Sequence, residues 1–286
     1  MIPISRALRG RGDSGNPIPE IYKALEKVGA RPRRGQMTLV AGGPGSGKTA
    51  LVVNWIIKAG LPTAYISADT DASTLAERVS AQLLNKTVDE MEYHFAERDE
   101  VYERAIKAMA DASPHVAWDF NRGPDLRSIE GSLEQFNYLN QEDPAIIVID
   151  NLKNVYSDSD ADANGEGHVR YNAVLDGLNL ISGKTGACVI VLHHATGAYE
   201  DGYTPIPMSG ILGKASKDFA LILTVHRGGQ YQNVSIVKNR SGKADPNGSL
   251  IAPIPFDPAR MLYQEDYDPS DPNPPWHNVN LTGVAA

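Results

Sequence analysis

The sequence predicts an α/β fold, with a mainly parallel, twisted central sheet and helices on both of its faces. Segments typical of strands alternate with segments typical of helices along most of the chain, as expected when helices connect parallel strands. The segment AIIVID at 145–150 is apolar up to its last residue, as a central strand buried on both faces would be. A third indication is the segment QMTLVA at 36–41, a strand that runs straight into a glycine-rich turn.

Each element follows from the local pattern of apolar, charged and turn-forming residues. The expected strands cover residues 36–41, 63–67, 115–120, 145–150, 187–192, 219–225 and 233–237. The expected helices cover residues 48–59, 73–84, much of 87–112, 125–140 and a segment that ends near 183. The polar segment 157–168 and the Gly/Pro-rich segment 196–213 are expected to be loops.

Composition divides the chain into three regions. Residues 1–34 form a basic arm with eight Lys or Arg against three acidic residues, and we expect a short helix at 19–28. Residues 35–256 contain all the expected strands and form the α/β domain. Residues 257–286 are rich in Asp and Pro, and we expect this tail to be extended or disordered, with Trp276 as an anchor.

The composition of the 286 residues also limits the classes of function. A formal net charge of −8 argues against coating duplex DNA through bulk positive charge, although it leaves room for local nucleic-acid contacts. No apolar run approaches the ~20 residues that span a bilayer, and the N-terminus lacks the apolar core of a secretory signal. We therefore expect a cytoplasmic protein that does not enter a membrane. The single cysteine, Cys188, excludes an internal disulfide.

The strongest chemical signal is a match to the phosphate-binding pattern G-x-x-x-x-G-K-[ST], between an expected strand and an expected helix. Its glycines let the backbone wrap around phosphate oxygens, and the helix N-terminus adds positive potential. Lys48 is expected on the β- and γ-phosphates and Thr49 on Mg²⁺, with the next residue, Ala50, also against the nucleotide. The motif consists of Gly42, Gly43, Pro44, Gly45, Ser46, Gly47, Lys48 and Thr49.

Two aspartates follow expected strands. Asp150 ends AIIVID, where a P-loop enzyme holds Mg²⁺, and we expect it to share that ion with Thr49. Asp69 follows the strand at 63–67 and is a candidate base for the attacking water. The alternative for Asp69 is a helix N-cap, a role that Asp71 or Ser73 could equally fill.

Polar residues also follow two later strands. His193 and His194 end VIVLHH, and adjacent residues of a strand point to opposite faces. We therefore expect only one of them, His194, to sense the γ-phosphate, the alternative being a core histidine. Lys238 and Arg240 follow VSIV, far from the P-loop of their own chain. Arg240 can either reach the phosphates of a neighbouring subunit or belong to a solvated, charged turn.

Together, GGPGSGKT, YISAD, AIIVID, VLHH and VKNRSG resemble the RecA-like ATPase core of DnaB-type replicative helicases and RepA-type plasmid helicases. The resemblance covers residues 30–256. It implies that Asp69 stands where the family has a catalytic Glu. It also implies that Arg78, which matches an Arg nine residues after that Glu, contacts the nucleotide. It also places His194 at the position of a phosphate-sensing Gln. Lys238 and Arg240 match the lysine and the arginine finger that act across the subunit interface.

The resemblance further implies an NTP-hydrolysing DNA helicase or translocase that uses ATP, or another NTP, with Mg²⁺. Its partners would be single-stranded DNA, identical subunits in a hexameric ring, and other replication proteins. The DNA would lie on loops 157–170 and 196–217. The arm 1–34 either clasps a neighbouring subunit or folds on its own domain. The candidate DNA contacts are Arg170, Lys214, Lys217, Gly210, Gly213, Tyr199 and Tyr203.

Two other functions fit the same motifs. A RecA-like ATPase can serve recombination or regulation without unwinding DNA. An ATPase core can also be coupled to strand cleavage, here through the acids between Asp158 and Asp162. Filament formation without unwinding distinguishes the first from a helicase, and cleavage with Mg²⁺ but no NTP distinguishes the second.

Overall fold

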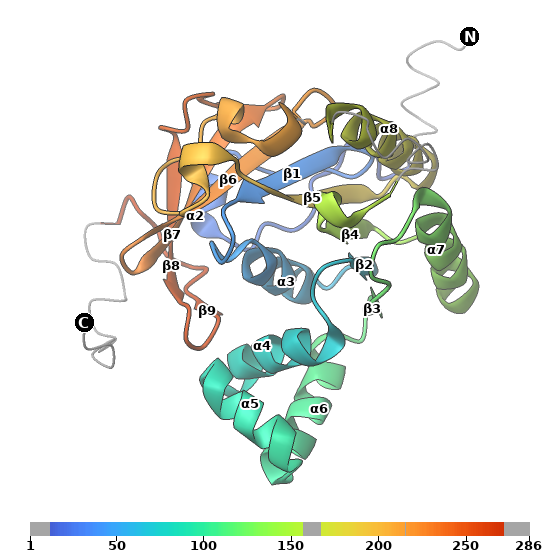
Figure 1. Ribbon diagram of the computed structural model, residues 1–286, viewed down its shortest axis with the longest axis vertical. Helices are drawn as coiled ribbons and strands as arrows, with labels where there is room; N and C mark the ends of the chain where they lie inside the picture. The colour runs from blue at the N-terminus through green and yellow to red at the C-terminus, as the bar shows by residue number, and fades with distance from the viewer. Residues whose placement is uncertain (1–11, 157–166, 215, 272–286) are drawn as a thin grey trace.

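The computed structural model describes residues 12–156, 167–214 and 216–271, without the side chains of 167–170 and 214. Within these residues a nine-stranded sheet runs in the order β3-β2-β4-β5-β1-β6-β7-β8-β9. Figure 1 shows helices packed on both sides of this sheet and a separate helical lobe beside it. The predicted alternation of strands and helices is therefore present, with an antiparallel extension that was not expected.

The strand bounds fall within a few residues of those predicted for the first seven strands. The strands are β1 (Met37–Gly42), β2 (Thr63–Ser67), β3 (Val116–Asp119), β4 (Ile146–Asp150), β5 (Cys188–His194), β6 (Leu221–Gly228), β7 (Tyr231–Asn239), β8 (Ile251–Asp257) and β9 (Leu262–Tyr263). Strands β1–β6 pair in parallel, and β6–β9 pair antiparallel.

Four of the described α-helices begin at a side-chain cap, which satisfies backbone N–H groups that have no partner within the helix. The α-helices are α2 (Lys23–Lys27), α3 (Lys48–Ala59), α4 (Ala72–Leu84), α5 (Val88–Glu97), α6 (Glu100–Ala112), α7 (Leu126–Asn140) and α8 (Gly167–Thr185). Short 3₁₀ helices are η1 (Leu152–Asn154), η2 (Gly197–Tyr199), η3 (Met208–Gly210) and η4 (Leu212–Lys214). Asp99 breaks the expected helical segment 87–112 into α5 and α6 by capping the latter.

The core has one layer on each face of the sheet. Alternate residues of a strand enter different layers, as the two-residue period of a strand requires. In β1, Val40 packs with helix α3 and the N-terminal arm, whereas Leu39 packs with α7 and α8. Helices α4, α5 and α6 form the separate lobe of Figure 1, with a small core of its own made by Ala81, Met91 and Ala105.

The described part of the basic arm folds onto its own domain. Ile18, Tyr22 and Leu25 are buried in the main core, and the indole of Trp55 donates to the carbonyl of Pro19 at 2.9 Å. Residues 12–34 thus pack on their own domain, as one of the two alternatives expected, and a clasp on a neighbouring subunit stays a prediction. The expected helix at 19–28 is reduced to the five residues of α2. Residues 1–11 lie outside the described part of the chain.

The expected tail is also partly folded, which corrects its description as extended or disordered. Residues 257–271 contain the end of β8 and all of β9. Tyr263 packs in the main core, with its ring stacked on Phe256 at 4.4 Å and edge-on to Tyr22 at 5.5 Å. The segment suggested a tail because it is rich in Asp and Pro, although it also contains the consecutive apolar residues Met261, Leu262 and Tyr263. Trp276 lies outside the described residues.

Candidate active site

The glycine-rich motif forms a tight loop between β1 and α3. Gly47, at the start of α3, has a φ of +88°, a left-handed conformation that residues other than glycine rarely adopt. A Cβ atom on Gly43 would lie 2.5 Å from the carbonyl oxygen of Glu200, so a larger residue would not fit there. The loop therefore has the close backbone curvature that a phosphate-binding loop needs.

Lys48 lies inside this loop. Its side chain is buried, and its Nζ donates to the carbonyl oxygens of Gly42 at 3.0 Å and Gly43 at 2.9 Å. Burial lowers the pKa of Lys48 to about 8, and the nearby charges of Asp150 and Asp69 limit that fall. A phosphate anion bound in this loop would give Lys48 Nζ a negatively charged partner in place of these neutral carbonyl oxygens. Such a partner favours the protonated form of the lysine.

Asp150 and Thr49 are brought together as the magnesium prediction requires. Thr49 Oγ1 donates to Asp150 Oδ2 at 2.9 Å, and the hydroxyl of Tyr65 donates to the same oxygen at 2.7 Å. Burial raises the pKa of Asp150, while hydrogen bonds from Tyr65 and Thr49 and the charge of Lys48 oppose that rise. A hydroxyl and a carboxylate are the hard oxygen donors that Mg²⁺ prefers, so this pair fits the ion.

Asp69 lies near this pair and is held by Asn151, a residue that the sequence did not single out. Strands β2 and β4 are neighbours, so Asp69 and Asn151 leave the sheet side by side. Asn151 Nδ2 donates to Asp69 Oδ2 at 2.9 Å, and Asn154 Nδ2 donates to Asp69 Oδ1 at 3.0 Å. Asp71, not Asp69, caps α4, because its carboxylate accepts from the backbone N–H of Thr74 at 3.0 Å. The capping alternative for Asp69 is therefore wrong.

The same asparagine reaches His194. Its Nδ2 lies 3.2 Å from His194 Nε2, and an amide nitrogen carries two hydrogens, so it can donate to both Asp69 and His194. Partial burial lowers the pKa of His194, and the positive charges of Lys48 and Lys153 lower it further. The imidazole is therefore neutral near pH 7.

His193 points away from this network. It is fully buried, its Nε2 lies 3.0 Å from the carbonyl oxygen of Leu212, and its ring is edge-on to Tyr171 at 5.0 Å. Burial lowers the pKa of His193 to about 4. Of the two adjacent histidines, His194 lies beside the P-loop residues and His193 lies in the core.

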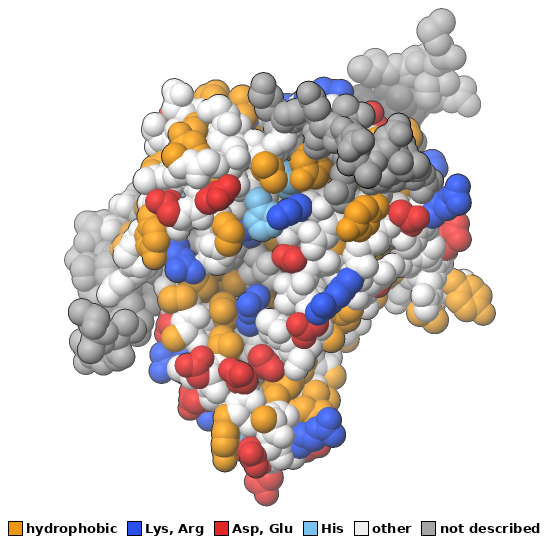
Figure 2. Space-filling model, in the orientation of Figure 1, with side chains coloured by type: hydrophobic (Ala, Val, Ile, Leu, Met, Phe, Trp, Pro, Cys, Tyr) orange, Lys and Arg blue, Asp and Glu red, His pale blue; other side chains and the backbone are white. Residues whose placement is uncertain are grey.

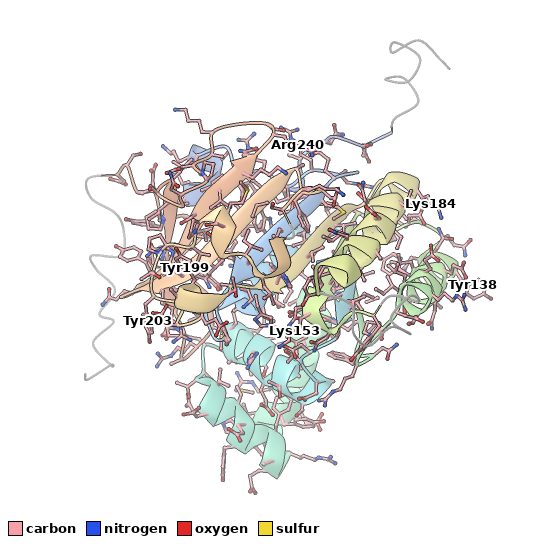
Figure 3. The ribbon with its side chains drawn as sticks, turned by 45° about the horizontal axis from the view of Figure 1, so that its top comes forward. Tyr138, Lys153, Lys184, Tyr199, Tyr203 and Arg240 are labelled. Atoms are coloured by element: carbon pink, nitrogen blue, oxygen red, sulfur yellow. The ribbon has the colours of Figure 1, made fainter. Side chains whose placement is uncertain are left out.

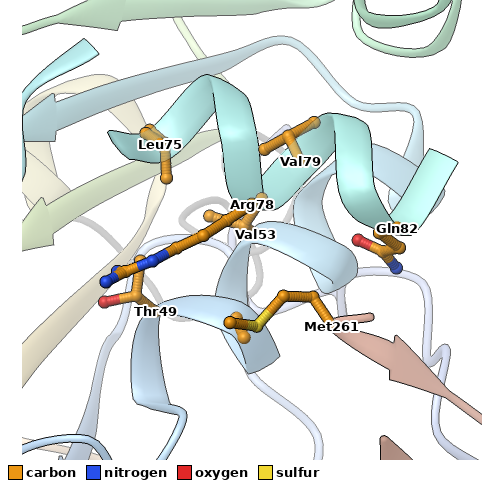
Figure 4. Close-up of a pocket in the computed structure, with 8 residues that line it drawn as sticks. Thr49, Val53, Leu75, Arg78, Val79, Gln82 and Met261 are labelled. Atoms are coloured by element: carbon orange, nitrogen blue, oxygen red, sulfur yellow. The ribbon is translucent and has the colours of Figure 1, made fainter. Parts of the chain in front are cut away.

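Arg78 projects from α4 toward Thr49. Figure 4 shows its side chain extending alongside a small pocket, with Met261 of the β8–β9 turn on the other side. This places the guanidinium next to the P-loop helix, where the resemblance predicted a nucleotide contact. The pocket is lined by Thr49, Ala50, Val53, Leu75, Arg78, Val79, Gln82 and Met261.

Lys238 and Arg240 lie at the opposite edge of the sheet. Because β7 is antiparallel to β6, its last residue, Asn239, pairs with Leu221, and Leu221 pairs with Thr38 at the start of β1. The P-loop follows the other end of β1. Figure 3 labels Arg240 and also Lys153, which lies two residues after the site residue Asn151.

Both residues contact the backbone of residues 216–217. Lys238 Nζ donates to the carbonyl oxygens of Ser216 at 2.7 Å and Lys217 at 3.1 Å, and Arg240 Nη2 donates to that of Lys217 at 3.4 Å. Burial lowers the pKa of Lys238, and so does the charge of Arg240. Within one chain, neither residue reaches the candidate site.

The expected DNA loops are described only in part. Residues 157–166 and the side chains of Arg170 and Lys214 lie outside the described residues. Tyr199 packs against Gly210, whereas Tyr203 is 63% exposed. Lys217 is exposed as well. Among the described residues, no helix has the length and apolar character needed to cross a membrane.

The candidate site can now be compared with known proteins. Residues 23–198 match the AAA domain family, which amounts to more than half of the chain. The chain belongs to this family. A gene 65 protein of Mycobacterium phage L5 is 38% identical over 254 residues, which cover 86% of this chain and 92% of the phage protein. The gene 65 protein of Mycobacterium phage D29 is 38% identical over 228 residues, or 77% of this chain and 95% of that protein.

A more distant relative carries a functional name. A probable plasmid replicative DNA helicase of Chlamydia trachomatis is 23% identical over 240 residues, covering 79% of this chain and 51% of the chlamydial protein. This chain therefore matches about half the length of that helicase.

Solved structures agree on the fold. A solved structure of an ATPase domain superposes with a TM-score of 0.73 at 16% identity, over 91% of this chain and 95% of that domain. A DnaB-like replicative helicase, in a structure that concerns its interactions with primase, gives the same TM-score at 15% identity, over 91% of this chain and 66% of the helicase. The predicted fold is confirmed: the chain is a P-loop NTPase with the RecA-like fold of DnaB-type ATPase domains.

Proposed function

We propose that this AAA-family chain is an NTP-hydrolysing DNA helicase or translocase that acts as a ring of identical subunits on single-stranded DNA. The observation that carries the proposal is the division of the candidate residues between two edges of the sheet. Lys48, Asp150 and Asp69 cluster at one edge, and Arg240 lies at the other. A site that needs both groups is then completed only where two subunits meet.

At the first edge, each residue has a role that its contacts support. The P-loop amides and Lys48 bind the triphosphate of ATP or another NTP. Thr49 and Asp150 hold Mg²⁺, which neutralises phosphate charge when it is bound. Asp69, held by Asn151 and Asn154, orients the attacking water and accepts its proton.

His194 is the residue that links the nucleotide to the rest of the chain. As a neutral imidazole beside Asn151, it can hydrogen-bond to the γ-phosphate or to the water, and it ends β5 just before the loop 196–217. Hydrolysis changes the partner available to His194. The loop that follows this strand is where we place contact with DNA, through Lys217 and Tyr203, together with residues 157–170.

At the other edge, Arg240 and Lys238 act on a neighbouring subunit's nucleotide. A guanidinium stays charged at any physiological pH and can neutralise the charge that develops on the transferred phosphoryl group. In the ring, the backbone contacts at Ser216 and Lys217 keep both residues at the end of β7. Other replication proteins are expected partners of such a ring.

The helical lobe is unsuited to DNA. Residues 88–112, which contain helices α5 and α6, carry eight acidic residues against three Lys or Arg. Figure 2 shows acidic side chains gathered over the lobe formed by α4–α6. Because such a surface repels DNA phosphates, the single DNA strand should pass along the loops at the end of β5 instead.

Unwinding of a forked DNA with ATP and Mg²⁺ tests the proposal, with electron microscopy of the same sample. We expect rings and strand separation for the unaltered chain, and neither hydrolysis nor unwinding for Lys48→Ala. Open filaments that hydrolyse ATP without strand separation would contradict the helicase and favour a recombination or regulatory ATPase. Cleavage of the DNA with Mg²⁺ in the absence of NTP would favour a nuclease.

A further inference from the structure

The backbone of the P-loop is held from outside by residues that the site motifs do not include. Gln232 of β7 donates from Nε2 to the carbonyl oxygen of Ser46 at 2.7 Å. The hydroxyl of Tyr263, on β9, donates to Gln232 Oε1 at 3.0 Å and lies 3.5 Å from the carbonyl oxygen of Gly47. Its single hydrogen serves the shorter of these contacts. Arg227 of β6 also donates to the carbonyl oxygen of Gly45.

These contacts decide where the amides of the loop point. In a planar trans peptide, the carbonyl oxygen and the following N–H point in opposite directions. When Gln232 holds the Ser46 carbonyl toward β7, the N–H of Gly47 faces the inside of the loop. Phosphate is bound by such inward-facing N–H groups. A Cβ on Gly47 would collide with the amide nitrogen of Gln232, so the side chain fits only against this glycine.

The pair is rigid because it is buried. Gln232 is 1% exposed and Tyr263 is 6% exposed, so water does not compete for their hydrogen bonds. The ring of Tyr263 is fixed between Phe256 and Tyr22. A buried polar pair of this kind keeps one geometry, because leaving either partner unsatisfied is costly.

We propose that Gln232 and Tyr263 are positioning residues for nucleotide binding, which set the orientation of the P-loop amides before the phosphate arrives. The inference rests on the proposed use of this loop for NTP. Both residues lie beyond residues 23–198, the part of the chain that matches the AAA domain family. The antiparallel strands thus contact the backbone of the P-loop on the side away from the nucleotide and do not touch the nucleotide itself.

Two variants remove the hydrogen bonds while keeping the shape. Gln232→Met retains the length of the side chain and loses both of its hydrogen bonds, and Tyr263→Phe loses only the hydroxyl. We expect the Kd for mant-ADP and for ATPγS with Mg²⁺ to rise about tenfold in Gln232→Met and about threefold in Tyr263→Phe. These factors correspond to the net free energy contributed by the buried hydrogen bonds that each variant loses. KM for ATP should rise in parallel, while kcat changes by less than about threefold, because the amides bind ground state and transition state alike.

Two matched controls separate positioning from general stability. Tyr22→Phe removes an equally buried hydroxyl from the adjacent ring, but that hydroxyl donates to the carbonyl oxygen of Leu51 instead of the P-loop. Ser235→Ala changes a buried side chain on the same strand as Gln232, and its hydroxyl has no partner among the described residues. Both controls should bind nucleotide as the unaltered chain does.

Tyr263→Phe keeps the test valid if Gln232→Met does not fold. Unchanged nucleotide affinity in the folded variants, or an equal loss in Tyr22→Phe, would overturn the positioning role. A chain that binds and hydrolyses ATP but separates no DNA strands would instead overturn the proposed function. Failure of the unaltered chain to bind any nucleotide would overturn both.

Discussion

The parallel and the antiparallel halves of the sheet contribute to the candidate site in different ways. In the parallel half, β1, β2, β4 and β5 all end at the same edge, so the residues after them meet. In the antiparallel half, successive strands end at opposite edges. The parallel half therefore brings the candidate catalytic residues together at one edge. The antiparallel half places some residues behind the P-loop and others at the opposite edge.

The difference explains how one chain could carry both parts of the proposed shared site. β6 brings Arg227 to the P-loop edge, and the return strand β7 carries Lys238 and Arg240 to the other edge. Gln232, at the start of β7, remains beside the P-loop. Reversal of one strand is thus enough to place Arg240, the proposed finger, at the edge of the sheet opposite the P-loop.

Mixing two inactive variants tests whether the far edge acts in trans. Arg240→Ala and Lys48→Ala should each lower hydrolysis by ~10³-fold or more, because each removes a charge that stabilises the transferred phosphoryl group. Subunit exchange between them should restore measurable hydrolysis, since some interfaces pair an intact P-loop with an intact finger. The measurement is the ATPase rate against mixing ratio.

Assembly of the mixture should be checked by light scattering, and Lys48→Ala should keep a normal circular dichroism spectrum. A flat rate at the level of the single variants, in confirmed mixed assemblies, would show that Arg240 does not act across the interface. Rescue would not occur in that case because every site would lack one group.

Asp69→Asn tests the catalytic side of the near edge. We expect nucleotide to bind normally while the rate of hydrolysis falls ~10²–10⁴-fold, because the attacking water loses its base. Asp71→Asn is the matched control: it makes the same change two residues away, and Asn caps a helix about as well as Asp. A fall of less than about threefold in Asp69→Asn would remove the catalytic role from this residue.

Asn151 and Asn154 both hold Asp69, but only Asn151 also reaches His194. Each variant leaves one hydrogen bond to Asp69, but only Asn151→Ala also removes the contact with His194. We therefore expect Asn151→Ala to lower kcat about tenfold, and Asn154→Ala to lower it by less. The measurement is steady-state hydrolysis with and without single-stranded DNA. Equal effects of the two variants would indicate that the contact between Asn151 and His194 has no part in the reaction.

The smallest effect on hydrolysis is expected at His193, which faces the core and acts on stability instead. Its pKa in the folded chain is lowered to about 4, whereas the pKa of an unfolded histidine is near 6.5. Below about pH 6.5 the unfolded state therefore binds a proton that the folded state does not, and the free energy of unfolding decreases as the pH is lowered. We expect the free energy of unfolding to drop about 1–2 kcal/mol between pH 7 and pH 5 through this group. Urea titrations should show a smaller pH dependence in His193→Gln. An identical dependence in both proteins would contradict this assignment.

Sequence alone determined the elements and chemistry that depend on local patterns. The alternation of strands and helices, the P-loop and the acid that ends AIIVID are encoded in consecutive residues, so their positions are recovered in the structure. The position of Asp69 after β2 was recovered for the same reason. The only sequence signal for Asn151 was that it is a polar residue directly after a strand, and polar residues are common at that position.

Tertiary structure decided which distant side chains support that chemistry. The link from Asn151 to Asp69 depends on the pairing of β2 with β4, and the hold of Gln232 on Ser46 depends on the hairpin of β6 and β7. Tyr65 contacts Asp150 for a similar reason, since its hydroxyl reaches across to a neighbouring strand. The order of strands is set by burial of the whole sheet, a property that no single segment contains.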